Sequence, residues 1–233
     1  HRDLHLSIRR QRQMCIRDRR VAAGLADPDR LVVRACAESL VWLKHPALER
    51  RLRSAVPGNV KPNELEVILI GARIVQPDLS SHLLTVCQDR ALGARRFEVL
   101  AALGSPAGVP IVMDGLRDPA PTIARSAATA FSRLLGAVID SDQRISTPRS
   151  QAYDPETDDE FADDGWAPDA MAAASIWQSQ VDTLSTAERI AGGHPIDDDA
   201  MTLEQAPSAF EWRSRLMRRS LSVAAEPAGN LPG

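Results

Sequence analysis

The chain has 233 residues, a formal net charge of −3 and three cysteines. It contains no run of about 20 apolar residues, so the sequence predicts no membrane-spanning helix. The acidic balance argues against nonspecific binding of nucleic acid, which is therefore not the expected partner. Cys36 and Cys87 fall within apolar helical patterns. We expect them to be buried free thiols in a reducing compartment.

Residues 1–19 do not fit the pattern of the rest of the chain. The run from Arg9 to Arg19 resembles a translated sequencing adapter of the transposase type, and the stretch from His1 to His5 fits the other end of the same oligonucleotide. A natural basic arm is the alternative, but it explains only the charge. We expect residues 1–19 not to be native, so that the remaining chain has 22 basic and 29 acidic residues.

Between residues 20 and 136 the apolar residues recur at helical spacing. Two helices share one pattern, because Asp27-Pro28 and Asp118-Pro119 each precede a helix and an arginine follows seven residues after the aspartate. Asp-Pro supplies an N-cap and a first-turn proline. Helix-opening prolines at 46, 77 and 106 alternate with these helices. A period near 30 with two helices predicts an all-α fold of the α-solenoid type.

These features resemble the short bacterial type of HEAT repeat over residues 20–136. The Asp-Pro turn and the arginines at 34, 96 and 125 carry the resemblance, whereas Leu65 stands where one repeat should have its arginine. The resemblance implies that Asp27, Arg34, Asp118 and Arg125 link neighbouring repeats. We interpret Trp42, at the end of an apolar stripe, as a core or inter-repeat residue.

Residues 137–165 change character. Residues 137–188 hold twelve acidic and two basic residues, and the acidic run 154–164 contains little apolar surface. Such a segment buries too little apolar area to offset the entropy of ordering, so we predict an acidic disordered linker over 137–165. Phe161 and Trp166 are candidate docking residues, either for the chain's own basic face or for a partner.

A small helical C-terminal module is predicted over residues 166–223, followed by a disordered tail at 224–233. Its expected helices span residues 168–181, 183–191 and 207–223. The stretch from Arg189 to Ile196, together with the acidic linker and the helix carrying Trp177, resembles uncharacterised bacterial HEAT-repeat proteins encoded among type VI secretion genes. This resemblance implies a cytoplasmic accessory role with no known chemistry.

No nucleophile–base arrangement, phosphate loop or cofactor motif is legible in the sequence, so we predict no catalytic residue and no cofactor. His194 followed by Asp197, Asp198 and Asp199 is the one His–carboxylate cluster, but it lacks the spaced ligands of a defined metal site. A basic ridge is the candidate partner-binding surface, opposite in charge to the acidic run. It comprises Arg50, Arg51, Arg53, Arg95 and Arg96.

The sequence therefore favours a noncatalytic protein–protein interaction scaffold with an unidentified protein partner. Two alternatives remain open. The chain could be an enzyme that resembles HEAT-type bilin lyases and acts on a tetrapyrrole. It could also be a HEAT-type protein that binds or repairs DNA, against which the net charge argues.

Overall fold

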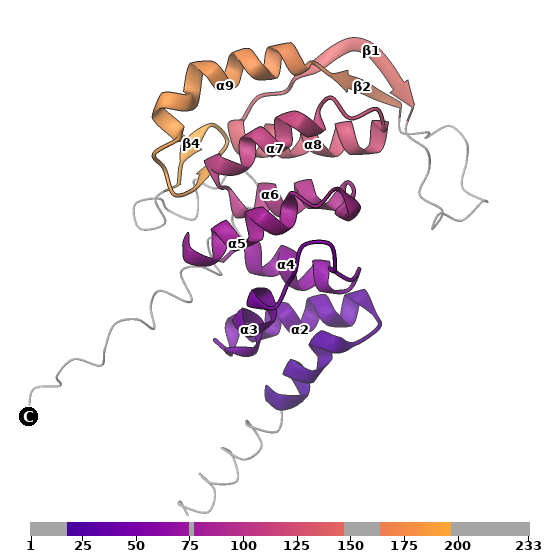
Figure 1. Ribbon diagram of the computed structural model, residues 1–233, viewed down its shortest axis with the longest axis vertical. Coiled ribbons are helices and arrows are strands. Elements are labelled where there is room, and N and C mark those ends of the chain that lie inside the picture. Colours follow the sequence, from indigo (N-terminus) through magenta and orange to yellow (C-terminus); the bar gives the residue numbers. More distant parts are fainter. Residues whose placement is uncertain (1–17, 75–76, 147–163, 197–233) are drawn as a thin grey trace, which may run out of the picture. The chain divides into compact units, whose positions relative to one another are not determined.

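The computed structural model describes residues 18–74, 77–146 and 164–196, and most of these residues lie in helices (Figure 1). The chain divides into two compact units. The described residues of the first are 18–74 and 77–86, and those of the second are 87–146 and 164–196. The division differs from the predicted boundary after Gly136, because residues 87–136 share a core with the segment 164–196. The predicted helix 207–223 and tail 224–233 lie outside the described residues.

The first unit consists of helical segments that pack around α4. Its elements are a helical run over 18–23, η1 (Gly24–Ala26), α2 (Arg30–Trp42), α3 (Ala47–Arg53), α4 (Glu64–Ala72) and α5 (Pro77–Cys87), whose last residue belongs to the second unit. Both α2 and α3 pack against α4, which is buried along nearly its whole length. This burial explains why Leu65 fits where the repeat pattern would place an arginine.

An ion pair between the exposed Arg30 and the buried Glu66 joins α2 to α4. The guanidinium of Arg30 donates to Glu66 Oε1 through Nε at 3.2 Å and Nη2 at 2.9 Å, and Glu66 is only 2% exposed. Because a buried charge is costly unless it is paired, this contact fixes the α2–α4 register. Gly71 gives α3 room beside α4, since a Cβ there would clash with Leu52.

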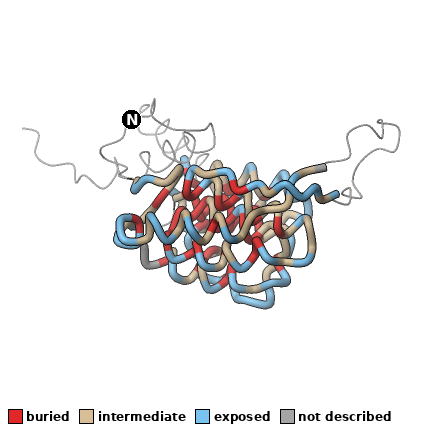
Figure 2. Tube along the Cα trace, turned by 90° about the horizontal axis from the view of Figure 1, so that it is seen from above, coloured by how far each residue is buried: buried red, intermediate tan, exposed pale blue. Residues whose placement is uncertain are grey.

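The second unit repeats this neighbour scheme and adds two small β elements. Its helices are η2 (Arg90–Leu92), α6 (Arg95–Leu103), η3 (Pro106–Gly108), α7 (Val109–Gly115), α8 (Pro121–Leu135) and α9 (Ala170–Leu184). Here α6 and α7 pack against α8, as α2 and α3 do against α4, and α9 lies beside α7 (Figure 1). Phe97 and Phe131 are fully buried in this unit. Figure 2 shows buried and exposed positions alternating along the helices.

Three aspartates form the same local turn before a helix. The carboxylates of Asp27, Asp89 and Asp118 accept a hydrogen bond from the backbone N–H two residues later, at 2.8, 2.9 and 3.0 Å. The prediction that Asp27 caps α2 was wrong. Asp29 is the N-cap and accepts from Leu31 N, because Asp27 instead closes the preceding turn.

The arginines seven residues after these aspartates have different surroundings. Arg34 lies 3.8 Å from Glu38 of its own helix, whereas Arg96 is buried and stacks on Phe97. Arg125 lies against β2, so close that a Cβ on Gly165 would come within 2.6 Å of its Cζ. The sequence pattern therefore predicts the aspartate turn, but it does not predict which residue the arginine contacts.

Part of the predicted linker is a β-ribbon. Strand β1 (Asp140–Ser146) pairs antiparallel with β2 (Asp164–Pro168), with Arg144 opposite Trp166 and an irregularity between Asp140 and Arg144. The ribbon forms because Ile139 is buried, its carbonyl accepts from Asp169 N, and β2 packs against α8. Residues 147–163 lie outside the described part of the chain.

A second β element closes the ends of α6 and α8. Strands β3 (Ile190–Ala191) and β4 (His194–Pro195) form a hairpin around Gly192-Gly193, where the sequence predicted a helix over 183–191. Gly192 N and Gly193 N donate to Arg133 O and Leu134 O of α8.

The same hairpin also donates hydrogen bonds to the C-terminal end of α6. Ile190 N donates to Gly104 O at 2.6 Å, and Arg189 Nη2 donates to Ala102 O at 2.6 Å. The last carbonyls of a helix have no intrahelical donor. The hairpin supplies hydrogen-bond donors to these carbonyls at the C-terminal ends of α6 and α8.

Candidate interaction surface

Helix α3 carries the first three predicted site residues. Its last turn holds Arg50, Arg51 and Arg53, positions at which cations interact favourably with the helix dipole. Two of them are paired, because Arg51 Nη2 contacts Glu64 Oε1 of α4 and Arg53 Nη2 lies 2.8 Å from Glu49 Oε1 of its own helix. The guanidinium of Arg50 is exposed and has no ion-pair or hydrogen-bond partner among the described residues. Arg50 therefore presents its full charge to the solvent.

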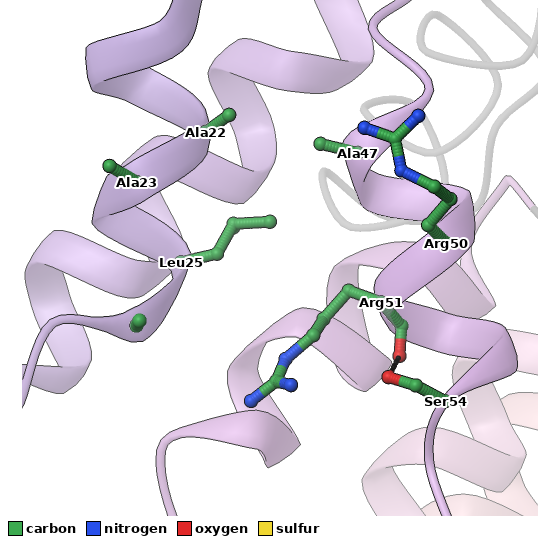
Figure 3. Close-up of a pocket in the computed structure, with 8 residues that line it drawn as sticks. Ala22, Ala23, Leu25, Ala47, Arg50, Arg51 and Ser54 are labelled. Atoms are coloured by element: carbon green, nitrogen blue, oxygen red, sulfur yellow. Dashed lines mark hydrogen bonds between the residues drawn. The ribbon is translucent and has the colours of Figure 1, made fainter.

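A pocket of about 350 Å³ lies between α3 and the segment 22–26 (Figure 3). One wall is made by Ala22, Ala23, Leu25 and Ala26, and the other by Ala47, Arg50, Arg51 and Ser54. Figure 3 shows the two walls facing each other across the pocket.

The pocket walls combine apolar and cationic groups. The Ser54 hydroxyl donates to Arg51 O at 2.7 Å, so it is already engaged within α3. The remaining lining chemistry is methyl groups together with two guanidinium groups. Such a site can hold an apolar group and an anion side by side, and it offers no general base or nucleophile.

The second pair of predicted site residues does not form the expected surface. Arg96 is only 3% exposed, and its Cζ lies 4.7 Å from the centroid of the Phe97 ring. The prediction that Arg96 belongs to a solvent-facing ridge was therefore wrong, because its helical position points into the core of the second unit. Arg95 is partly exposed and lies 3.9 Å from Glu98 Oε2.

Of the two aromatic candidates, only Trp166 lies within the described residues. It is 44% exposed on β2, and the guanidinium of Arg144 lies 5.2 Å from its ring. Phe161 falls outside the described part of the chain. Trp42, interpreted as a core residue, is 45% exposed at the end of α2. The buried positions of α2 are Val33, Ala37, Leu40 and Val41, and Trp42 is the last residue of the helix.

Both thiols and the histidine of the predicted His–carboxylate cluster lie within the described residues. Burial raises the pKa of the Cys87 thiol to about 12, against the opposing effect of Arg96, and Cys36 is partly buried with its pKa also raised.

His194 is exposed on β4, and Asp197 to Asp199 lie beyond the described residues. Within residues 18–74, 77–146 and 164–196 no group of three potential metal ligands occurs. None of the helices in these ranges is long and apolar enough to cross a membrane.

Sequence reasoning missed the wall that faces α3. The signal was the short run of small residues at Ala22-Ala23 and Ala26, which leaves space beside a neighbouring helix. It also missed Arg144, because the β-ribbon that brings it to Trp166 joins residues separated by a long polar stretch. Comparison of the chain with protein-family models, with curated proteins and with solved structures found no match.

Proposed function

We propose that this chain is a noncatalytic interaction scaffold built from HEAT-like helical repeats, and that it binds a protein partner through the α3 surface. Two observations support the repeat interpretation. Both units pack alternate helices against each other with the intervening helix beside them. The aspartate turn also recurs at Asp27, Asp89 and Asp118, each seven residues before an arginine.

The unpaired charge of Arg50 carries the proposal for the binding surface. A surface cation without an internal acid keeps its electrostatic field available for a partner, whereas a paired cation does not. Arg51 and Arg53 have acids of their own, and Arg96 is buried. The binding surface is therefore narrower than the ridge of five arginines, and Arg50 is its centre.

The cellular setting is proposed from resemblance. The stretch Arg189 to Ile196 is the part that resembles the HEAT-repeat proteins encoded among type VI secretion genes. In the second unit this stretch closes the ends of α6 and α8. We therefore propose a cytoplasmic bacterial accessory protein in which this hairpin has a structural role and the α3 surface contacts the partner.

Affinity capture from a bacterial lysate tests the proposal. The full chain, Arg50→Glu and Arg53→Glu are immobilised separately, and the retained proteins are identified by mass spectrometry. We expect one protein to be retained by the wild type and by Arg53→Glu but lost from Arg50→Glu, because Arg53 pairs with Glu49 whereas Arg50 has no acid partner among the described residues. Retention of the same proteins by all three baits would refute the proposed binding surface.

A further inference from the structure

We propose that the pocket between the segment 22–26 and α3 accepts one bulky apolar side chain from an acidic segment of the partner, with a neighbouring carboxylate on Arg50. This inference rests on the proposed function and adds the chemical class of the partner. It predicts that recognition needs two elements together, an apolar group for the pocket and an anion beside it.

The apolar requirement follows from the pocket lining. Five of its eight residues are alanine or leucine. A cavity of about 150 Å³ is large enough for benzene, so a pocket of about 350 Å³ has room for an aromatic or branched aliphatic side chain and part of its backbone. Covering these methyl groups removes apolar surface from water, which favours binding.

The requirement for a carboxylate in the partner follows from the positive charge of Arg50 beside the pocket. Arg50 lines the pocket and its guanidinium has no partner among the described residues. Arg51 also lines the pocket, but Glu64 takes part of its hydrogen-bonding capacity. One free guanidinium beside an apolar pocket matches a carboxylate that lies next to an apolar side chain.

A peptide fits this surface better than a nucleic acid does. Binding of single strands relies on aromatic platforms on which bases stack and on a continuous basic groove. The pocket lining contains no aromatic side chain and only two arginines, one of which is ion-paired. The net charge of −3 further disfavours a polyanion as the partner.

Three fluorescein-labelled peptides test the inference on the full chain. The first has the sequence Asp-Asp-Glu-Phe-Ala-Asp-Asp, which occurs at residues 158–164 and combines one aromatic residue with carboxylates. In the second peptide alanine replaces phenylalanine, and in the third Asn and Gln replace the acids. Fluorescence anisotropy then gives the Kd of each peptide. We expect the first to bind about tenfold or more tightly than either of the others, since both elements contribute.

Matched variants locate the binding. Ala23→Trp fills the pocket from an exposed wall position, and Ala35→Trp adds the same side chain at an exposed position on α2 outside the pocket. Ala23→Trp should lower the affinity for the first peptide to that of the second, and Ala35→Trp should not. Arg50→Gln should weaken both acidic peptides, whereas Arg53→Gln should not. Circular dichroism checks that each variant is folded.

The outcomes separate this inference from the proposed function. Equal binding of the first and second peptides, weakened only by Arg50→Gln, would overturn the apolar pocket and leave the α3 surface in place. Unchanged binding in Arg50→Gln would overturn both. Absence of binding by the first peptide would overturn the pocket inference, and the lysate experiment would then decide the proposed function independently.

Discussion

The C-terminal ends of α8 and α3 meet the same physical requirement in different ways. A helix ends with carbonyl groups that lack intrahelical donors and with a partial negative charge. At α8 the hairpin supplies Gly192 N and Gly193 N as donors, and the end is closed by backbone. At α3, Ser54 N bonds to Arg50 O and Arg51 O, and arginine side chains provide the positive charge. The first arrangement closes the helix end with backbone donors, whereas the second leaves the Arg50 guanidinium exposed.

The comparison teaches how an arginine cluster should be interpreted. Arg96 and Arg50 look alike in the sequence, yet one is buried over Phe97 and the other is exposed without an acid. Pairing and burial, which only the structure provides, separate a buried cation from an exposed and unpaired one.

The largest effect is expected where the hairpin touches α8. Gly193 has φ +80°, and a Cβ there would lie 2.7 Å from Leu135 O. Gly193→Ala should lower the free energy of unfolding of the second unit by about 2–3 kcal/mol, because backbone strain adds to steric overlap. Urea unfolding followed by tryptophan fluorescence in a Trp42→Phe, Trp212→Phe background measures this, because Trp166 and Trp177 of the second unit then give the signal.

Gly192 provides the matched control. It has φ +60° but open space around the position of a Cβ. Gly192→Ala should therefore cost only about 1 kcal/mol, the cost of the left-handed conformation. Equal effects of the two substitutions would mean that the close approach to α8 contributes nothing.

The next effect is the pH dependence of the free energy of unfolding that the buried Cys87 causes. Burial raises the pKa of Cys87 from 9.0 to about 12, so the folded state holds its proton at pH values where the unfolded state has lost it. The second unit should lose about 1.4 kcal/mol of stability per pH unit between pH 9 and 12. Urea unfolding at pH 8.5 and 10.5 should show this extra loss in the wild type and not in Cys87→Ala. An identical pH dependence of both proteins would contradict it.

A smaller effect is expected at the end of α6. Arg189 Nη2 donates to Ala102 O across the hairpin. Arg189→Met retains much of the aliphatic stem but removes this donor, which should cost about 1–2 kcal/mol of unfolding free energy. Faster amide exchange at Gly104, measured by hydrogen–deuterium exchange, would locate the loss at α6. Unchanged exchange there would show that Arg189 does not hold this end closed.

The smallest effect on stability is expected at α3. Arg50 has no partner to lose, so Arg50→Gln should change the free energy of unfolding by less than about 0.5 kcal/mol. Arg53→Gln removes an exposed pair with Glu49 and should cost about 0.3–0.5 kcal/mol. Thermal unfolding of both variants checks this. A large loss in Arg50→Gln would assign that side chain a structural role instead.

The sequence predicted the helices better than their partners. The Asp-Pro turns and the prolines at 46, 77 and 106 mark where helices begin, and α3, α5, α7 and α8 begin within a few residues of such signals. These signals are local, so they survive whatever the helix packs against. Gly136 likewise ends α8 in the left-handed conformation expected of a helix C-terminus.

The remaining features depend on contacts between distant residues. The β1–β2 ribbon pairs Arg144 with Trp166 across a polar stretch, and the β3–β4 hairpin matters because it reaches Gly104 and α8. No local pattern encodes these pairings. The candidate site also depends on a distant contact, because Glu64 of α4 pairs with Arg51 and leaves its sequence neighbour Arg50 exposed and unpaired among the described residues.

The salt dependence of peptide binding tests the central claim most directly. The Kd of the Asp-Asp-Glu-Phe-Ala-Asp-Asp peptide is measured for the full chain and for Arg50→Gln from low to high ionic strength. An unpaired Arg50 that binds an acidic partner predicts tight binding at low salt, weakening as salt screens the contact, with both properties largely lost in the variant. The same Kd for both proteins at every salt concentration would contradict the account.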